Sequence, residues 1–280
     1  MKLSGIIPVL PTPFTPDGDI DFASFEKAVD HAIDCGASAA VMFGLASEYY
    51  KLDWSEHVRL RREVAPAVAG RVPVIISVTH HATEVAAQQA RAAVDEGADA
   101  VMVLPPFFLN PPPQAIAEHV REIAGAVRVP LIVQYAPAQT GIAPEVLASL
   151  AASYVKVDAV PSFIVPDVPT IIGYNGLDLP RAFAGGCVAC MPGVAMTRAF
   201  VRIWGLLGTD FARGQAEHAR LLPLLQFMME SVEKLIACEK HILQRRGVLN
   251  SAYSRRPRVT LNTMELRTLE RMVSEVGDLL

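Results

Sequence analysis

Eight short apolar runs alternate with helical patterns along the 280 residues, and this alternation constrains the fold more than any other feature. The runs are rich in β-branched residues and are continuous rather than cleanly alternating, as in parallel strands that helices cover. They occupy residues 5–10, 37–43, 72–78, 100–104, 129–133, 154–157, 170–172 and 187–190. Eight strands with intervening helices in a chain of this length predict an α/β protein with a (β/α)8 TIM barrel.

A doubly wound open sheet is the alternative fold, but no G-x-G-x-x-G turn follows the first strand to support a dinucleotide site. The strand-like runs stop after Pro192, and residues 197–280 have helical patterns with one polar break near residues 251–257. We therefore expect residues 1–210 to form the barrel and residues 211–280 to form a C-terminal helical extension packed on it.

The sixth strand-to-strand connection is too short for an ordinary crossover helix. It contains Pro161, Pro166 and Pro169, which break helical structure. Ten residues of extended chain reach roughly 33 Å, so the return to the next strand needs no helix. We expect the sixth barrel helix to be short or absent, which would leave apolar surface for a partner subunit or the C-terminal helices to cover.

Composition indicates a folded protein without a polyanionic partner, because 51% of the residues are hydrophobic and the net charge is −4. Pro8, Pro11 and Pro13 interrupt the apolar start, which does not resemble a signal peptide. No window approaches the roughly 18 to 20 apolar residues of a membrane span. Four cysteines do not suggest a disulfide scaffold in a chain of this length. We expect a cytoplasmic protein with no membrane or nucleic-acid partner.

Lys156 is the one lysine that lies in a strand-like apolar run. The period of two places Tyr154, Lys156 and Asp158 on one face of the sixth strand. Val155 and Val157 on the other face suit the helix layer, which turns Lys156 inward. Burial disfavours a charged ammonium, and the neutral amine can attack a carbonyl carbon. The alternative is that Lys156 is an ion-paired structural cation.

Several motifs occur in the chain in an order and with a spacing that are typical of one protein family. They are Gly5-Ile6-Ile7-Pro8 with Thr12-Pro13-Phe14, the G-x-x-x-E loop from Gly44 to Glu48, Pro137-Ala138-Gln139-Thr140-Gly141, Lys156 and Gly185-Gly186. With these motifs the chain resembles the dihydrodipicolinate synthase / N-acetylneuraminate lyase family of class I aldolases. The resemblance covers nearly the whole length and is weaker in the helical tail.

The resemblance implies a (β/α)8 barrel with a helical extension, a homotetramer, and catalysis without a cofactor or metal. Members of the family form a Schiff base between the strand lysine and a 2-oxo acid such as pyruvate, and Lys156 matches that lysine. The other matched positions lie near the substrate carboxylate or where the pocket lining is expected; they are Gly44, Leu45, Ala46, Ser47, Glu48, Gly173 and Cys190.

The chain departs from the family where protons are relayed. The position of the relay tyrosine on strand five holds Gln134, and Tyr135 follows it. A one-residue offset reverses the face, so Tyr135 replaces that tyrosine only if the strand end bulges. Gln139 stands where an arginine often binds a second carboxylate. We expect Gln134 and Gln139 to bind substrate, and we do not expect dihydrodipicolinate synthesis itself.

Because of further departures from the family pattern, the sequence does not identify which residues act as the catalytic acid and base. Leu45 and Ala46 replace hydroxyl residues, and Phe107-Phe108 stands where another relay tyrosine is common. Ser47, Glu48 and Tyr135 remain candidates for acid/base catalysis, with geometry deciding among them. Glu48 could instead hold its loop or pair with a cation.

Two other motifs have ordinary interpretations. His80-His81 could indicate a metal-dependent aldolase, but adjacent histidines point apart on extended chain and no carboxylate cluster accompanies them. Cys187 and Cys190 have redox-motif spacing, but positions i and i+3 of a strand face opposite sides. Loop and core roles are therefore expected for these residues.

Two functional classes follow. The first is a lyase, an aldolase or a dehydratase, that acts on a 2-oxo acid through a Lys156 Schiff base, with a 2-keto-3-deoxy sugar acid as the expected substrate. The second is a non-catalytic or repurposed paralogue that binds an oxo acid or a protein partner.

Overall fold

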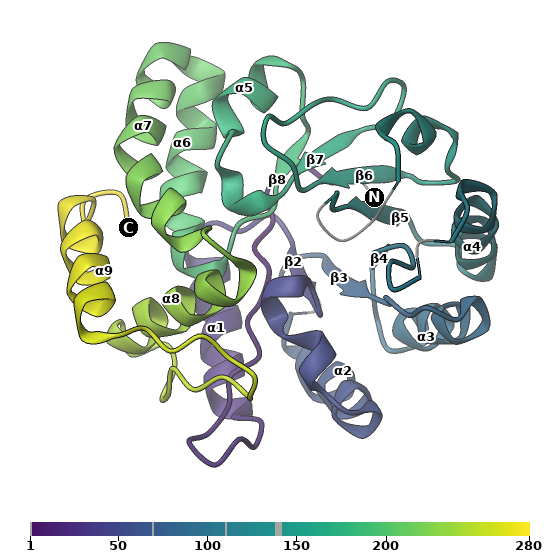
Figure 1. Cartoon of the computed structure of the whole chain (residues 1–280), viewed down its shortest axis with the longest axis horizontal. Helices are drawn as coiled ribbons and strands as arrows, with labels where there is room; N and C mark the ends of the chain where they lie inside the picture. Colours follow the sequence, from purple (N-terminus) through teal and green to yellow (C-terminus); the bar gives the residue numbers. More distant parts are fainter. Residues whose placement is uncertain (1, 69, 110, 138–141) are drawn as a thin grey trace.

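The computed structural model describes residues 2–68, 70–109, 111–137 and 142–280. Its sheet has eight strands, in the order β1-β8-β7-β6-β5-β4-β3-β2, and every pair is parallel (Figure 1). The strands are β1 (Gly5–Ile6), β2 (Ala40–Met42), β3 (Val74–Ser77), β4 (Ala100–Val103), β5 (Leu131–Tyr135), β6 (Tyr154–Val157), β7 (Thr170–Ile172) and β8 (Ala189–Cys190).

Val9 closes the barrel between the first and last strands of this order. It bridges in parallel to Val41 on one side and to Gly193 on the other. Leu10 N donates to Val41 O at 2.9 Å, and β1 pairs directly with β8. The strands therefore follow one another around a closed ring, which confirms the (β/α)8 barrel and excludes the open doubly wound sheet.

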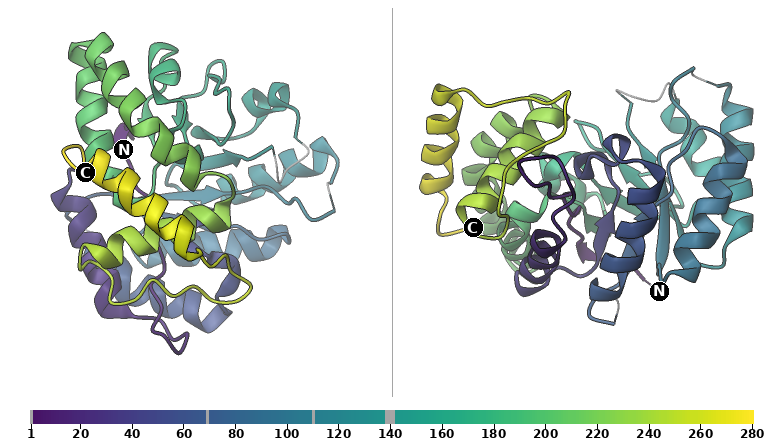
Figure 2. Two further views of the ribbon diagram at one scale, coloured as in Figure 1. Left: turned by 60° about the vertical axis from the view of Figure 1, so that its left-hand side comes forward. Right: turned by 90° about the horizontal axis from the view of Figure 1, so that it is seen from below.

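Helices cover the outside of this ring and extend beyond it (Figures 1 and 2). Those of the barrel are α1 (Phe22–Asp34), α2 (Trp54–Val68), α3 (Thr83–Asp95), α4 (Pro113–Ala126), α5 (Leu179–Ala184) and α6 (Thr197–Thr209). The C-terminal ones are α7 (Phe211–Met228), α8 (Val232–Arg245) and α9 (Thr263–Glu275). The short 3₁₀ helices are η1 (Leu45–Ser47), η2 (Tyr49–Lys51), η3 (Pro144–Ser149), η4 (Tyr174–Gly176) and η5 (Val194–Met196).

The expected division of the chain falls at Asp210, between α6 and α7. The Asp210 carboxylate accepts a hydrogen bond from Arg213 N at 3.1 Å, so it caps the first turn of α7. The other two C-terminal helices also begin at side-chain caps, Ser231 for α8 and Asn262 for α9. Within the described ranges no helix is long and apolar enough to cross a membrane.

The connection between β6 and β7 contains no helix, as the prolines predict. Its own apolar side chains cover the barrel there. The Phe163 ring lies 5.5 Å from the Tyr135 ring, Ile164 lies against Gly185, and Val165 is buried. Among the large hydrophobic side chains of this connection, Val160 alone is exposed, at 55%. The connection's own side chains therefore cover part of the surface that we expected a partner subunit or the C-terminal helices to cover.

Two apolar layers hold the barrel together. The inner layer lies inside the ring and includes Ile7, Val41, Met102 and Tyr154. The outer layer fills the space between strands and helices and includes Val155 and Val157. Because Tyr154 belongs to the inner layer and its neighbour to the outer one, the predicted alternation along β6 is confirmed and Lys156 points inward.

Candidate active site

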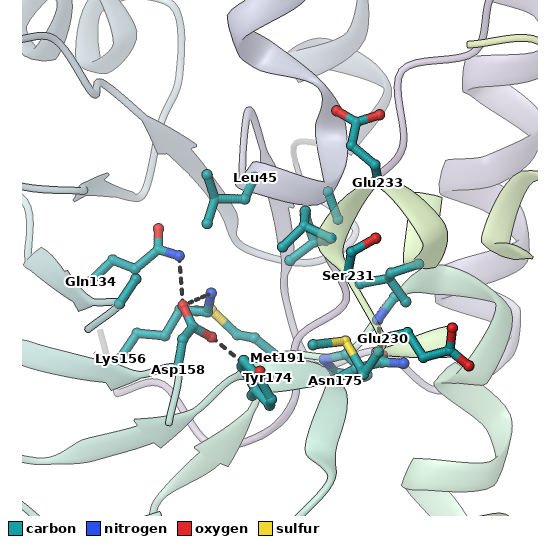
Figure 3. A pocket seen from close by; sticks show the side chains of 18 of the residues that line it. Leu45, Gln134, Lys156, Asp158, Tyr174, Asn175, Met191, Glu230, Ser231 and Glu233 are labelled. Atoms are coloured by element: carbon teal, nitrogen blue, oxygen red, sulfur yellow. Dashed lines mark hydrogen bonds and ion pairs between the residues drawn. The ribbon is translucent and has the colours of Figure 1, made fainter. Parts of the chain in front are cut away.

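A cavity of about 610 Å³ opens at the carboxyl ends of the strands. Strand ends form one wall, and the start of α8 forms the opposite wall (Figure 3). The described residues that line it include Val9, Leu45, Ala46, Gln134, Ala136, Lys156, Asp158, Tyr174, Asn175, Met191, Gly193, Glu230, Ser231, Glu233 and Leu235. The cavity is large enough for a small sugar acid.

Lys156 and Asp158 form an ion pair inside this cavity. The Lys156 amine lies 2.8 Å from Asp158 Oδ2, and their side chains are 7% and 10% exposed. Gln134 Nε2 donates to the same carboxylate oxygen at 2.6 Å, and Tyr174 N donates to Asp158 Oδ1 at 2.7 Å. Figure 3 shows the three side chains converging at the strand ends. The carboxylate is therefore fixed on both oxygens while it contacts the amine.

The sheet register produces this cluster. Gln134 of β5 is the direct partner of Lys156 in β6, so the two side chains share the inner face. Gly173 follows β7 on the other side of β6. A Cβ at Gly173 would lie 1.7 Å from Asp158 Oδ1 and 2.8 Å from Lys156 Cε. Only glycine fits at this position, so it is the backbone of Gly173 that lies against the ion pair.

The loop after β2 supplies another part of the wall. Leu45 and Ala46 line the cavity, and Gly44 lies so close to Val9 that a Cβ would approach Val9 Cγ1 to 2.7 Å. Ser47 is buried beneath the loop. Its hydroxyl donates to Leu10 O at 2.6 Å, so this candidate acid/base group is engaged in holding the loop.

Glu48 anchors the same loop through buried charges. It has a left-handed backbone (φ 57°) and is fully buried. Its carboxylate pairs with Lys240 of α8 and with Lys51 at 3.0 Å, and Lys51 also binds Glu233 at 2.9 Å. Burial lowers the pKa of Lys240 to about 8, although Glu48 opposes that shift. Glu48 is not among the described residues that line the cavity, and its contacts match the alternative role of holding the loop.

Two of the remaining predicted residues, Tyr135 and Cys190, are not among the described residues that line the cavity. Tyr135 belongs to the outer layer and contacts Phe163, so the strand end does not bulge to bring it to Lys156. Burial raises the pKa of the Tyr135 hydroxyl. Cys190 is fully buried, with its sulfur near Gly176, and is not among the described lining residues. Gln139 lies outside the described residues.

The two ordinary interpretations agree with the contacts. His80 Nδ1 accepts a hydrogen bond from Ala82 N, while the His81 ring packs on Phe107 at 4.7 Å. The part of the chain that the structure describes contains no group of three or more metal-ligating side chains. Cys187 and Cys190 are both buried, and burial raises the pKa of Cys187 to about 12.

Sequence reasoning missed Asn175, two positions after the predicted Gly173, and the residues at the start of α8. Asn175 has a left-handed backbone (φ 50°), and its Oδ1 accepts a hydrogen bond from Gly193 N at 3.1 Å. Its Nδ2 is buried without a hydrogen-bond partner among the described residues. Ser231 and Glu233 form the far wall. No local pattern marks them, but the period of two already placed Asp158 on the face of Lys156.

Comparison with known proteins agrees with this fold. The Dihydrodipicolinate synthetase family matches residues 2–162. A 4-hydroxy-tetrahydrodipicolinate synthase from Haloarcula marismortui is 30% identical over 241 residues, which cover 80% of this chain and 78% of that protein. An L-2-keto-3-deoxyarabonate dehydratase from Azospirillum brasilense is 36% identical over 151 residues, 52% of this chain and 49% of that protein. The chain thus spans about half the length of the latter.

Solved structures agree over nearly the whole chain. The crystal structure of a dihydrodipicolinate synthase superimposes with a TM-score of 0.89 at 26% identity, and the match covers 99% of this chain and all of that chain. The related proteins are named as a synthase and a dehydratase. At the level of the family, this confirms the prediction that the protein is an enzyme. The barrel, the strand lysine and these matches together show that the chain belongs to the dihydrodipicolinate synthetase family.

Proposed function

We propose that the protein is a Schiff-base lyase that acts on a 2-oxo acid through Lys156. The single observation that carries this proposal is the position of the Lys156 amine, which lies inside a cavity of about 610 Å³ and contacts a fixed carboxylate. A purely structural ion pair would not need an open cavity above it, and a buried pair is weak evidence for a stabilising role.

The chemistry follows from the position of the amine inside the cavity. Lys156 Nζ adds to the C2 carbonyl carbon of the oxo acid, and loss of water gives an iminium ion. The iminium accepts the electron pair of a bond at C3, so that an aldol C3–C4 bond can break or a C3 proton can leave before the C4 hydroxyl is lost. The same imine therefore serves an aldolase or a dehydratase.

We propose a 2-keto-3-deoxy sugar acid as the substrate. The relative named L-2-keto-3-deoxyarabonate dehydratase supports this class. The resemblance implies that the substrate carboxylate binds at the Gly44–Ser47 loop, of which Leu45 and Ala46 line the cavity. Gln134, Asn175 and Ser231 also line it and offer polar groups to sugar hydroxyls. Gln134 in place of the relay tyrosine argues against the dihydrodipicolinate reaction. A homotetramer remains the expectation from the resemblance.

The second candidate is a paralogue that binds an oxo acid without turnover. The Lys156–Asp158 ion pair favours it, since an ion pair is also what a structural cation would form.

Crystals soaked with pyruvate, with a panel of 2-keto-3-deoxy sugar acids assayed in parallel, would separate the two candidates. The lyase predicts continuous density from Lys156 to the ligand, together with release of pyruvate for an aldolase or loss of water for a dehydratase. Density for a ligand that is not bonded to Lys156, with no turnover of any acid, would favour the binding paralogue.

A further inference from the structure

We propose that Asp158 is the catalytic acid and base of this site, accepting and returning the protons of imine formation and of the substrate C3 position. This assignment rests on the proposed function. Under this assignment, the proton transfers are carried out by a residue two positions after Lys156, on the same face of the strand.

The contacts of the carboxylate support the assignment. Asp158 Oδ1 is held by Tyr174 N at 2.7 Å, while Oδ2 accepts hydrogen bonds from Gln134 Nε2 at 2.6 Å and Lys156 Nζ at 2.8 Å. A carboxylate oxygen has two lone-pair sites, and both sites of Oδ2 are used. The iminium carries one N–H where the ammonium carried three, so its hold on Oδ2 weakens and this oxygen can accept a proton from the neighbouring reacting carbon.

The other acidic side chains that line the described part of the cavity form ion pairs or hydrogen bonds with other residues. Glu233 accepts hydrogen bonds from Lys51 at 2.9 Å and from the Tyr50 hydroxyl at 2.5 Å. Glu230 pairs with Lys234 at 2.7 Å and is 60% exposed. Of the acidic residues that line the described part of the cavity, Asp158 is the one that contacts the amine.

The inner face of the neighbouring strand offers no competing base. Its inward residue at this level, Gln134, is an amide that cannot titrate, and it donates to Asp158. Tyr135, the phenol next to Gln134 in sequence, lies on the outer face. Gln134 is therefore a positioning residue that orients the carboxylate.

Each step balances through one proton on Oδ2. The Lys156 ammonium first passes a proton to Asp158; the N–C2 bond then forms, the carbonyl electron pair moves to oxygen, and a second nitrogen proton passes to that oxygen to give the C2 hydroxyl. Asp158 returns its proton as this hydroxyl leaves as water, and the nitrogen electron pair forms the iminium. The C3–H bond then breaks, its pair forms C2=C3, the iminium pair returns to nitrogen, and Asp158 takes the proton. With pyruvate in D₂O, reversal of this last step places deuterium on the methyl group.

The test compares two measurements on Asp158→Asn. Borohydride reduction with pyruvate reports imine formation, and NMR in D₂O reports hydrogen exchange at the pyruvate methyl group. We expect the variant to reach the same final extent of trapping, more slowly, but to exchange roughly 100-fold more slowly or worse than the natural protein. Asp99→Asn is the control for loss of a hydrogen-bonded carboxylate, because Asp99 is an exposed residue that accepts a hydrogen bond from Val74 N at 2.9 Å at the opposite end of the barrel.

Asp158→Glu keeps the assignment testable if the asparagine variant does not fold. It retains the charge but displaces the oxygens, so exchange should fall, though less than in Asp158→Asn. Exchange at the natural rate in either folded Asp158 variant would overturn the assignment while leaving the proposed function intact. Loss of trapping in folded Asp158→Asn would also overturn it, since the carboxylate would then merely hold the amine. No trapping on the natural protein would overturn the proposed function and this assignment together.

Discussion

Gly173 shows how closely the residues around the reactive groups must fit. The Cβ of Gly173→Ala would lie 1.7 Å from Asp158 Oδ1, so the carboxylate and the amine must shift. We expect the free energy of unfolding to fall by about 1–3 kcal/mol, as in overpacked cores. We expect pyruvate trapping to slow by roughly 100-fold, because a displacement of about 1 Å can cost that much.

Gly205→Ala is the matched control for this prediction. Gly205 lies in α6, and a Cβ there would meet no heavy atom within 4 Å. That variant should be slightly more stable and should trap at the natural rate. Thermal melting and trapping rates check both variants, and natural trapping by Gly173→Ala would contradict the packing argument.

Glu239 makes stability depend on pH in a direction unusual for a carboxyl group. Burial raises its pKa to about 7, although Ala195 N and Arg246 oppose the shift. The folded state therefore holds a proton between pH 4.5 and 7 that the unfolded state has released, so stability falls as pH rises through this window. A shift of this size corresponds to about 3 kcal/mol.

Glu239→Gln imitates the protonated carboxyl group at every pH. We expect it to be about as stable as the natural protein near pH 4.5 and about 3 kcal/mol more stable at pH 8. Urea unfolding across this range measures the difference. Parallel pH profiles for the two proteins would mean that Glu239 is not the group responsible.

The element that completes the cavity is α8, and buried charge joins it to the loop after β2. Lys240 pairs with Glu48, which also binds Lys51. Removing one partner of a buried ion pair leaves a charge poorly compensated, at a cost of about 3–5 kcal/mol. We expect Lys240→Met to lose about that much stability in urea unfolding.

Two further variants test this interpretation of the anchor. Lys234→Met removes a cation of the same helix whose two partners, Glu230 and Glu265, are 60% and 29% exposed, and it should cost only about 1 kcal/mol. Adding Glu48→Gln to Lys240→Met should recover part of the lost stability, because no unpaired buried carboxylate remains. Equal losses for Lys240→Met and Lys234→Met would argue against a special anchor.

At the scale of the whole molecule, the barrel was predictable because its signals are local. Continuous apolar runs predicted the strands, the period of two predicted the direction of Lys156, and prolines predicted the missing sixth helix. The end of β5 was less well predicted, since the run at 129–133 became a strand at Leu131–Tyr135. Its bounds depend on pairing with β6, which the run itself does not specify.

The site was only partly predictable because much of it comes from distant chain segments. Glu48 and Lys240 are 192 positions apart, and no pattern around either residue indicates the other. Ser231 and Glu233 reach the cavity only because α8 packs over the strand ends. Tertiary packing, rather than sequence spacing, decides such contacts.

The central claim is that the Lys156 amine forms a covalent imine with a 2-oxo acid. Intact mass after borohydride reduction with pyruvate tests it most directly, with the natural protein compared with Lys156→Ala and with the exposed lysine variant Lys27→Ala. We predict one stable adduct on the natural protein and on Lys27→Ala, and none on Lys156→Ala. An adduct that persists in Lys156→Ala, or no adduct from pyruvate or from larger 2-oxo acids on any of the three, would contradict the claim.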